Sequence, residues 1–419
     1  MNSTLDERRQ FAGPALRAML GTPEVVPIND AVRNHTSEVY WDWRKSFESD
    51  PRATPLQHPD LVLSELATTS GESTQKPVLV RGGIGRGKNG CAILIPKTIR
   101  TSQLGGVGPD WKLQGLRLAG GRILGNADST ELQNSILKTA ASYATKSSAD
   151  FLLIEDLDES TPLFDAVYDH SAHECLLFVT HDFQRRHYID FPATEAQYAD
   201  SISNHSRKLF RRALKKCPNA HLERITSVNQ IPGFLDAAHE ISRHSWQSNQ
   251  FGMRIRNDEK ELRQLTSLAV NGLLRSYVFR IDGIPVAFAV GNQHGHRFRY
   301  EETAFNPEFR HFSPGRTMLQ LIIEDLLRHD SPKTFDFGFG DAEYKQQFAN
   351  RESRSGTLWL VPPGLRARLA LAHLNVCRQF RSAVYTRIRQ SGLGTIARQW
   401  LRSPSVGRVV SGNTEPESD

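Results

Sequence analysis

The chain has 419 residues, 38% of them hydrophobic and 23% charged, which is an ordinary globular composition that supports a buried core. A chain of this length is expected to form two or three domains. The net charge of +6, with a pI near 9.1, fits an anionic ligand, a nucleic acid or an acidic surface without selecting among them. It fits a basic surface with no special role equally well.

Several classes of protein are disfavoured by the pattern. Residues 1–26 are charged and lack the apolar stretch of a signal peptide, and no window approaches the roughly 20 apolar residues of a membrane span. The cysteines are scattered without paired spacing, which predicts neither a disulfide framework nor a zinc site: Cys91, Cys175, Cys217 and Cys377. We therefore expect a cytoplasmic protein that binds no metal.

The first half of the chain has the pattern of an α/β domain. After an N-terminal segment, residues 1–45, short apolar runs suited to buried strands alternate with a helical pattern. These are strands at 78–80, 92–95, 151–154 and 176–179, and a helix at 132–144. The sequence predicts a domain over residues 46–195.

A glycine loop in this half resembles a phosphate-binding loop. Residues 82–88 fit the spacing G-x-x-x-x-G-K, but Asn89 stands where that motif needs a Ser or Thr hydroxyl for Mg²⁺. A β-pattern follows at 92–95, where phosphate binding requires a helix N-terminus. The pattern favours a flexible hairpin tip over a nucleotide site.

The second half alternates helices and strands. A basic helix at 206–216 is followed by a helix at 231–247 and by a third, capped by Asn257 and running to Leu274. Asp282-Gly283 predicts a hairpin between strands 276–281 and 285–291. Ser313-Pro314 predicts a helix start, with Ser as N-cap and Pro at the first helical position. The remaining elements are strands at 297–305, 334–337 and 356–361, and helices at 313–329 and 343–350.

The composition shifts after residue 362. Between Leu365 and Arg408 the chain has nine arginines and no acidic residue, with apolar residues interspersed. Residues 363–410 are expected to form a basic helical tail whose arginines face solvent or an acidic partner, or which lies on an anionic membrane surface. Residues 411–419 are expected to be disordered.

The turn at residues 310–315 has the chemistry of an anion site. It joins a strand to an amphipathic helix, and a helix N-terminus offers backbone N–H groups and a positive dipole to an anion. Arg310 and Arg316 add charge at the same place. Taken alone, the pattern fits a well-capped helix with solvent-facing arginines at least as well.

The order of these segments over about residues 203–360 resembles the CelD/BcsL-like acetyltransferases, a GNAT group associated with cellulose and exopolysaccharide biosynthesis. It is more distantly similar to the FemAB peptidyl transferases. The motifs that carry the resemblance are the basic helix, Trp246, the Asp282-Gly283 hairpin, Asn306-Pro307, Ser313-Pro314-Gly315 and the run from Asp336 to Lys345. The resemblance implies a mixed α/β fold with two GNAT-like folds in tandem, the C-terminal one over residues 196–362. It also implies acyl transfer from acetyl-CoA or a longer acyl-CoA to an amine, such as an amino sugar or another small metabolite.

The resemblance assigns a CoA site. Such enzymes bind the CoA pyrophosphate on a loop of form R/Q-x-x-G-x-G/A, in which Arg310 takes the first position, Ser313 replaces the first Gly and Gly315 is the last. Pro314 removes one backbone N–H, so fewer contacts to the pyrophosphate are expected. Arg316 and Lys345 are further candidates to bind phosphate, Lys345 alternatively a carboxylate.

Acyl transfer to an amine needs a base, donors for the developing oxyanion and an acid for the leaving thiolate. Glu301 and Glu302 lie on the strand before Asn306-Pro307, and strand alternation allows only one of them into the acceptor cleft. We favour Glu302, because Glu301 shares its predicted face with arginines and is neutralised if it pairs with them. Asp336 is the competing base. Tyr344 is the candidate acid, unless it is only a packed aromatic.

Two other functions stay open. A FemAB-like aminoacyl or peptidyl transferase would use the basic helix at 206–216 to bind tRNA phosphates. A non-catalytic scaffold of two GNAT-like folds would dock through the basic tail. Binding of CoA distinguishes the first function from both.

Overall fold

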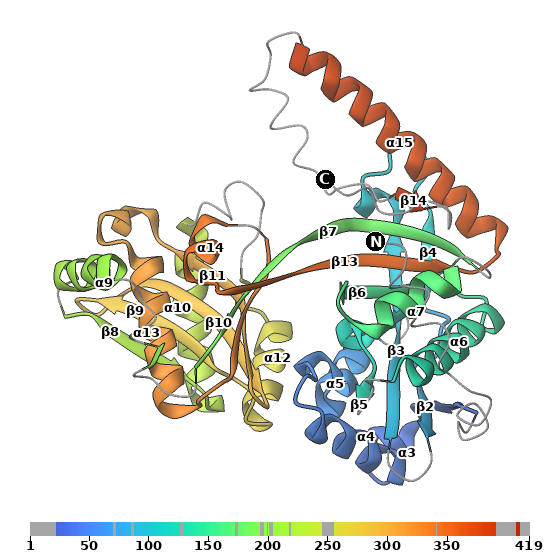
Figure 1. The fold of residues 1–419 in the computed structure, drawn as a ribbon, viewed down its shortest axis with the longest axis horizontal. Coiled ribbons are helices and arrows are strands. Elements are labelled where there is room, and N and C mark those ends of the chain that lie inside the picture. The colour runs from blue at the N-terminus through green and yellow to red at the C-terminus, as the bar shows by residue number, and fades with distance from the viewer. Residues whose placement is uncertain are drawn as a thin grey trace. The chain divides into compact units, whose positions relative to one another are not determined.

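The structure of the protein is a computed structural model (Figure 1). It describes residues 22–69, 73–84, 88–125, 129–171, 175–192, 197–198, 200, 204–217, 219–244, 255–340, 342–390 and 408–410. Predictions about residues 1–21, Trp246 and residues 411–419 therefore lie outside the described residues.

The chain divides into two compact units that are discontinuous in sequence. The first comprises residues 1–50, 65–184 and 354–419, and the second comprises residues 51–64 and 185–353. The sequence predicted a linear division at 195/196 with a separate tail. The difference arises from two long strands, β7 (Leu176–Asp190) and β13 (Arg351–Val361), each of which begins in one unit and ends in the other (Figure 1).

The main sheet of the first unit contains β7, β13 and five other strands. Its order is β1 (Glu24–Pro27), β2 (Val78–Ile84), β3 (Lys88–Arg100), β4 (Lys112–Leu118), β6 (Leu152–Asp158), β13 and β7. Strands β4 and β6 are parallel, whereas β1–β2, β2–β3, β3–β4 and β6–β13 are antiparallel. Two short strands, β5 (Leu124–Gly125) and β14 (Arg408–Val410), pair with β3 and β7.

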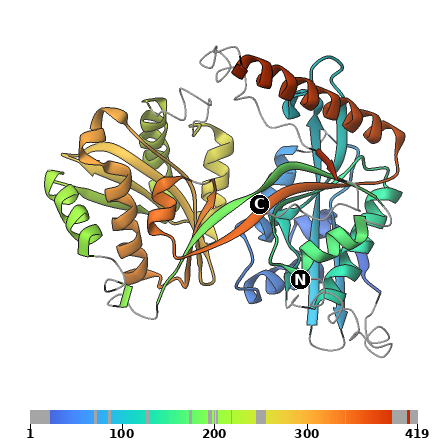
Figure 2. The ribbon, with the colours of Figure 1, turned by 45° about the horizontal axis from the view of Figure 1, so that its top comes forward.

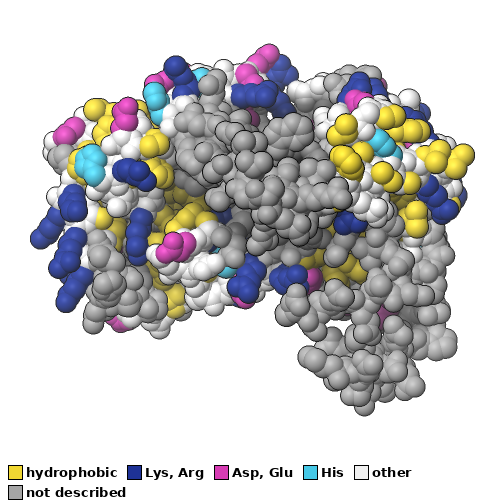
Figure 3. Space-filling view, turned by 90° about the horizontal axis from the view of Figure 1, so that it is seen from above, with side chains coloured by type: hydrophobic (Ala, Val, Ile, Leu, Met, Phe, Trp, Pro, Cys, Tyr) yellow, Lys and Arg dark blue, Asp and Glu magenta, His cyan; other side chains and the backbone are white. Residues whose placement is uncertain are grey.

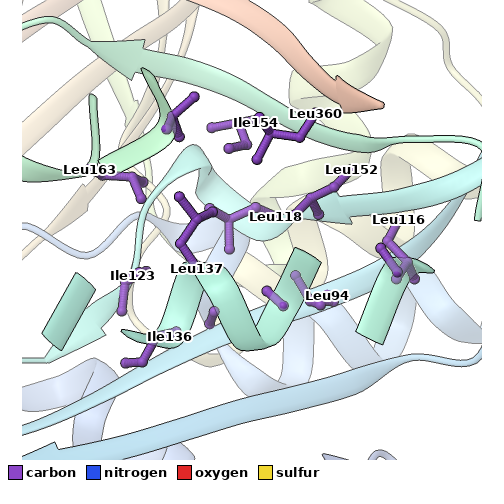
Figure 4. Packing of buried hydrophobic residues seen from close by; sticks show 14 of the residues in the cluster. Leu94, Leu116, Leu118, Ile123, Ile136, Leu137, Leu152, Ile154, Leu163 and Leu360 are labelled. Carbon is purple, nitrogen blue, oxygen red and sulfur yellow. The ribbon is translucent and has the colours of Figure 1, made fainter. Parts of the chain in front are cut away.

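Helices of the first unit pack on both faces of this sheet. They are α3 (Asp30–Arg33), α4 (Glu38–Ser49), α6 (Thr130–Lys146), α7 (Pro162–Ser171) and α15 (Leu365–Gln390), with η2 (Thr101–Leu104) and η3 (Ala119–Gly121). One core joins α6 and α7 to the strands through aliphatic side chains such as Leu118, Ile136 and Ile154 (Figure 4). A second core holds α15 against the stacked rings of Phe151 and Trp359.

The sheet of the second unit has the order β8 (His221–Ile225), β9 (Ser276–Ile281), β10 (Ile284–His294), β11 (Arg297–Phe305), β12 (Thr334–Phe339) and β7. Its helices are α9 (Asn204–Lys216), α10 (Ile231–His244), α12 (Glu259–Val270), α13 (Pro314–His329) and α14 (Glu343–Phe348), with η4 (Val228–Gln230) and η5 (Pro307–Phe312). Residues 51–64, the first segment of this unit, contain η1 (Pro55–Gln57) and the start of α5 (Pro59–Thr69). Helix α5 continues into the first unit, which resumes at residue 65. Helix α13 packs on the core side of β9, β10 and β11 (Figure 2).

The two units repeat one chain path. In the first unit a strand, a helix and a parallel strand follow one another as β4, α6 and β6, and then α7 and the long strand β7. In the second, β11, α13 and β12 are followed by α14 and the long strand β13. The predicted mixed α/β class, with two related folds in tandem, is confirmed.

Most helices and strands of the second unit lie where the local sequence pattern predicted them. The β9–β10 hairpin turns at Asp282 and Gly283, whose φ angles of 50° and 78° are those of a turn that needs two left-handed residues. The glycine loop lies in the β2–β3 hairpin, as expected, although residues 85–87 are outside the described residues. The predicted third helix was wrong at both ends: Asp258 caps α12, not Asn257, and α12 stops at Val270.

Candidate functional site

The site lies where β11 and β12 stop pairing. The two parallel strands share a ladder only from Arg297 to Arg299 and from Thr334 to Asp336. On its other side β11 stays paired with β10 as far as Phe305. Among the described residues, the backbone groups of β11 that follow Arg299 and face β12 therefore have no ladder partner, so they are available to a ligand that enters between the strands.

A β-bulge at Glu301 changes which way the two glutamates face. Val290 of β10 lies opposite Glu302 and Gly291 lies opposite Tyr300, so Glu301 is the extra residue. Glu302 therefore shares a face with Val290 and Asn292, and Glu301 accepts a 3.1 Å hydrogen bond from Asn292 Nδ2. The prediction that the two side chains project to opposite faces was wrong, because strict alternation fails at a bulge.

The two glutamates differ in environment. Glu301 is exposed, whereas Glu302 is half-buried. Burial raises the pKa of Glu302 above its ordinary value, and the charge of Glu261 on α12 raises it further. Burial raises the pKa of Glu261 as well. A carboxylate with a raised pKa is a stronger base, which suits Glu302 to that role.

The N-cap predicted for α13 is confirmed, but the residues before it differ from the prediction. Ser313 is the N-cap and Pro314 the first helical residue, but the residues before them form the 3₁₀ helix η5 instead of an open turn. Ser313 adopts left-handed φ and ψ angles of 53° and 49°, and its side chain makes no capping hydrogen bond. The N–H groups of Gly315 and Arg316 have no acceptor within the helix, because both lie in its first turn. Arg310 is exposed beside them.

Tyr344 and Lys345 lie at the start of α14. The Tyr344 ring packs edge-on against Phe337 at 6.2 Å, and burial raises the pKa of its phenol to about 12. The phenol therefore stays protonated at neutral pH, as an acid requires. Lys345 is buried, and its Nζ donates to the carbonyl of Phe339, so its ammonium closes the turn between β12 and α14. The sequence had assigned Lys345 to phosphate or a carboxylate instead.

Asp336 is fully buried and engaged in an ion pair. Arg186 of β7 donates to both carboxylate oxygens at 2.8 Å, and the backbone N–H of Gly338 donates to Oδ1 at 3.0 Å. Burial alone would raise the pKa of Asp336, but Arg186, Arg299 and Arg297 together lower it to about 2. So weak a base is poorly suited to take a proton from an amine at neutral pH, which disfavours Asp336 as the competing base.

Arg186 and Asn292 were not anticipated. Arg186 lies 150 residues from Asp336 in sequence and belongs to a stretch that reads only as a polar strand. Asn292 is 5% exposed and follows the apolar run at residues 286–290 of β10, so an amide close after that run was the available signal. Among the described residues, no group of three or more metal-ligating side chains occurs, and no helix has the length and apolar character to cross a membrane.

Comparison with known proteins identifies a GNAT domain within the second unit. Residues 204–346 match the family model of the acetyltransferase (GNAT) domain. The crystal structure of FemX aligns with a TM-score of 0.55 at 14% identity, covering 83% of this chain and 98% of that one. The C-terminal domain of a putative lysylphosphatidylglycerol synthetase from Agrobacterium fabrum aligns at 0.47, with 14% identity and 80% and 96% coverage. No curated protein matches the chain. The FemX likeness extends the shared fold over both units.

Proposed function

We propose that the GNAT domain at residues 204–346 transfers an acyl group from a CoA thioester to an amine. The observation that supports this most directly is the separation of β11 from β12 beyond Arg299 and Asp336. A thioester placed between the two strands meets unpaired backbone N–H groups of β11, which are suitable donors to an oxyanion.

The start of α13 is the proposed site of the CoA pyrophosphate. The N–H groups of Gly315 and Arg316 and the helix dipole favour an anion there, and Arg310 and Arg316 add two positive charges. A Cβ placed on Gly315 would lie 3.6 Å from Phe305 at the end of β11, so the turn adjoins the strand that would contact the thioester.

The proposed chemistry uses groups on both faces of β11. Glu302 takes a proton from the acceptor ammonium, and the free amine attacks the thioester carbonyl carbon. The new C–N bond forms as negative charge develops on the carbonyl oxygen beside the β11 backbone. The C–S bond then breaks, and Tyr344, on the α13 face, gives its proton to the departing thiolate. The amine loses its second proton to solvent, and Tyr344 regains one.

A thermal-shift titration tests the donor. Acetyl-CoA is expected to raise the melting temperature, because a ligand that binds only the folded state stabilises it. Arg310→Glu should abolish this shift without lowering the melting temperature of the free protein, since Arg310 is exposed. Arg328→Glu, at the far end of α13, is the matched control and should keep the shift. A full shift in Arg310→Glu would exclude this turn as the CoA site.

A second candidate function rests on the charge of α9. Lys208, Arg211, Arg212, Lys215 and Lys216 of this helix are exposed, and Figure 3 shows basic side chains gathered at that end of the second unit. Such a surface suits tRNA phosphates and an aminoacyl transfer. Binding of tRNA that weakens steeply with salt, together with no response to acetyl-CoA, would support this candidate instead.

A further inference from the structure

The face of β11 that carries the two glutamates also carries a surplus of positive charge. Arg299 lies opposite Asn292 of β10 and beside Asp336 of β12, so all three project to one face. Arg297, two residues earlier, shares this face. The ion pair with Arg186 neutralises the carboxylate of Asp336. The Nη1 of Arg297 is 4.0 Å from an oxygen of the same carboxylate. Two further guanidinium groups therefore surround a carboxylate that is already paired.

Arg299 and Asn292 each have one side-chain atom that lacks a hydrogen-bond partner among the described residues. Within the described part of the chain, no group accepts from Arg299 Nε. The Nδ2 of Asn292 donates to Glu301, but its buried Oδ1 has no donor among those residues. A half-buried cation or a buried amide oxygen that lacks a hydrogen-bond partner destabilises the folded protein, unless a ligand or a water molecule forms the missing hydrogen bond.

We propose that the acceptor is an amine that also carries an oxyanion, a carboxylate or a phosphate. The oxyanion binds Arg299 and Arg297, and the amine lies beside Asn292, Glu301 and Glu302. Because positions two apart on a strand face are separated by about 7 Å, an amine and an anion a few bonds apart can meet both groups. The acyl transfer itself rests on the proposed function, whereas the binding of an anionic amine does not.

This anion site is distinct from the proposed CoA site. Phe298 and Tyr300 of β11 face the core beneath α13, whereas Arg297 and Arg299 alternate with them and face the other side of the sheet. Burial lowers the pKa of Arg297, Asp336 raises it, and the neighbouring Arg299 lowers it, so an additional anion would relieve repulsion between the two arginines.

Matched pairs of amines test the proposal. With saturating acetyl-CoA, release of CoA is measured for glycine against glycinamide, for phosphoethanolamine against ethanolamine, and for glucosamine 6-phosphate against glucosamine. We expect at least one anionic member to exceed its neutral partner by about tenfold or more in kcat/KM. The preferred pair identifies the oxyanion as carboxylate or phosphate. Arg299→Gln should reduce kcat/KM for that acceptor by about 10- to 100-fold, the usual effect of a hydrogen bond to a charged group.

Controls separate binding from folding. Arg299→Gln should leave the melting temperature nearly unchanged, because the loss of its attraction to Asp336 is offset by relief of its repulsion with Arg297. Arg299→Lys should retain part of the preference. Arg280→Gln, in a surface pair with Glu223, should leave the preference intact.

Three outcomes would count against the proposals. Equal use of neutral and anionic amines would overturn the inference of an anionic acceptor but would leave acyl transfer supported. An anionic amine that stabilises the wild type but not Arg299→Gln, with no response to acetyl-CoA, would overturn acyl transfer alone. The inference also fails if no anionic amine stabilises the protein through Arg299.

A second inference rests on a different observation, an apolar stripe on α15. Leu365, Leu369, Val376 and Phe380 are 76%, 49%, 63% and 71% exposed, and their spacing of four, seven and four residues puts them on one helix face. The core of the first unit is packed by the other face, through Ala367, Ala370, Leu371 and Leu374. Figure 3 shows hydrophobic and basic side chains together where α15 lies.

We infer that this stripe lies on an anionic lipid surface. Residues 365–390 contain six arginines and no acidic residue, so a second copy of the helix would set arginine against arginine. An exposed apolar face flanked by arginines is instead the arrangement of helices that lie in a membrane interface. Such docking would hold the protein at a membrane surface through α15.

Co-sedimentation with vesicles tests this docking. We expect binding to vesicles of phosphatidylglycerol mixed with phosphatidylcholine, little binding to phosphatidylcholine alone, and weakening at high salt. The double variant Val376→Ser, Phe380→Ser should lose at least tenfold in vesicle affinity. Val270→Ser, which removes a comparably exposed apolar side chain from α12, is the control. Full binding by the double variant, or a stable dimer that this variant abolishes, would overturn the inference.

Discussion

Replacing Arg186 with Gln is expected to destabilise the protein far more than an ordinary charge deletion. Arg186 and Asp336 are 7% and 0% exposed and share two hydrogen bonds of 2.8 Å. Breaking a buried pair of this kind generally costs about 3–5 kcal/mol, because the remaining charge stays buried without its partner. We expect about 3 kcal/mol here, at the lower end, since Arg297 and Arg299 stay close to the carboxylate.

Urea unfolding of the wild type, Arg186→Gln and Arg280→Gln measures this loss. The Arg280 pair with Glu223 is partly exposed, so its removal should cost at most about 1 kcal/mol. If Arg186→Gln also costs less than about 1 kcal/mol at an unchanged m-value, the buried pair does not stabilise this unit as described.

The same pair predicts how stability depends on pH. The folded pKa of Asp336 is lowered from 3.8 to about 2, so its contribution is fully present above the unfolded pKa and is lost as pH falls towards 2. The full contribution is about 2 kcal/mol, of which about 1 kcal/mol should disappear between pH 5 and pH 3. Asp336→Asn should lack this component. An identical pH dependence in wild type and variant would refute the ionised state of Asp336.

Three further substitutions test the site and its supports. Glu302→Gln should lower the turnover of acetyl-CoA with a reactive amine by about 10²- to 10⁴-fold, with partial rescue at higher pH, whereas Glu301→Gln should lose much less; the reverse order would move the base to Glu301. Ser313→Gly should raise the free energy of unfolding by about 0.5–1 kcal/mol in chemical denaturation, because Ser313 is held at φ 53°; a loss of stability would mean that the hydroxyl has a role. Gly125→Ala should abolish soluble folding, since its φ is 96° and a Cβ would lie 2.1 Å from the Asn89 carbonyl oxygen; a near-native melting temperature would contradict that contact.

Much of the second unit was predictable because its signals are local. Asp-Gly at residues 282–283 selects a hairpin turn, and Pro at residue 314 preorganises the first turn of a helix. These preferences act within a few residues, so they survive whatever the chain packs against. The order of such segments was enough to indicate a GNAT domain, which the family match over residues 204–346 bears out.

The parts of the site that depend on distant contacts could not be predicted. The bulge at Glu301 arises from the register of β11 against β10, and one extra residue reverses the faces that alternation assigns. The pairing of Arg186 with Asp336 joins residues 150 positions apart, and it converts a candidate base into a structural anion. Likewise, the first unit is completed by residues 354–361 of β13, because a sheet accepts a strand by hydrogen bonding and burial, whatever its place in the chain. The sequence alone therefore determined the local elements and their order, and tertiary register decided which side chains face one another.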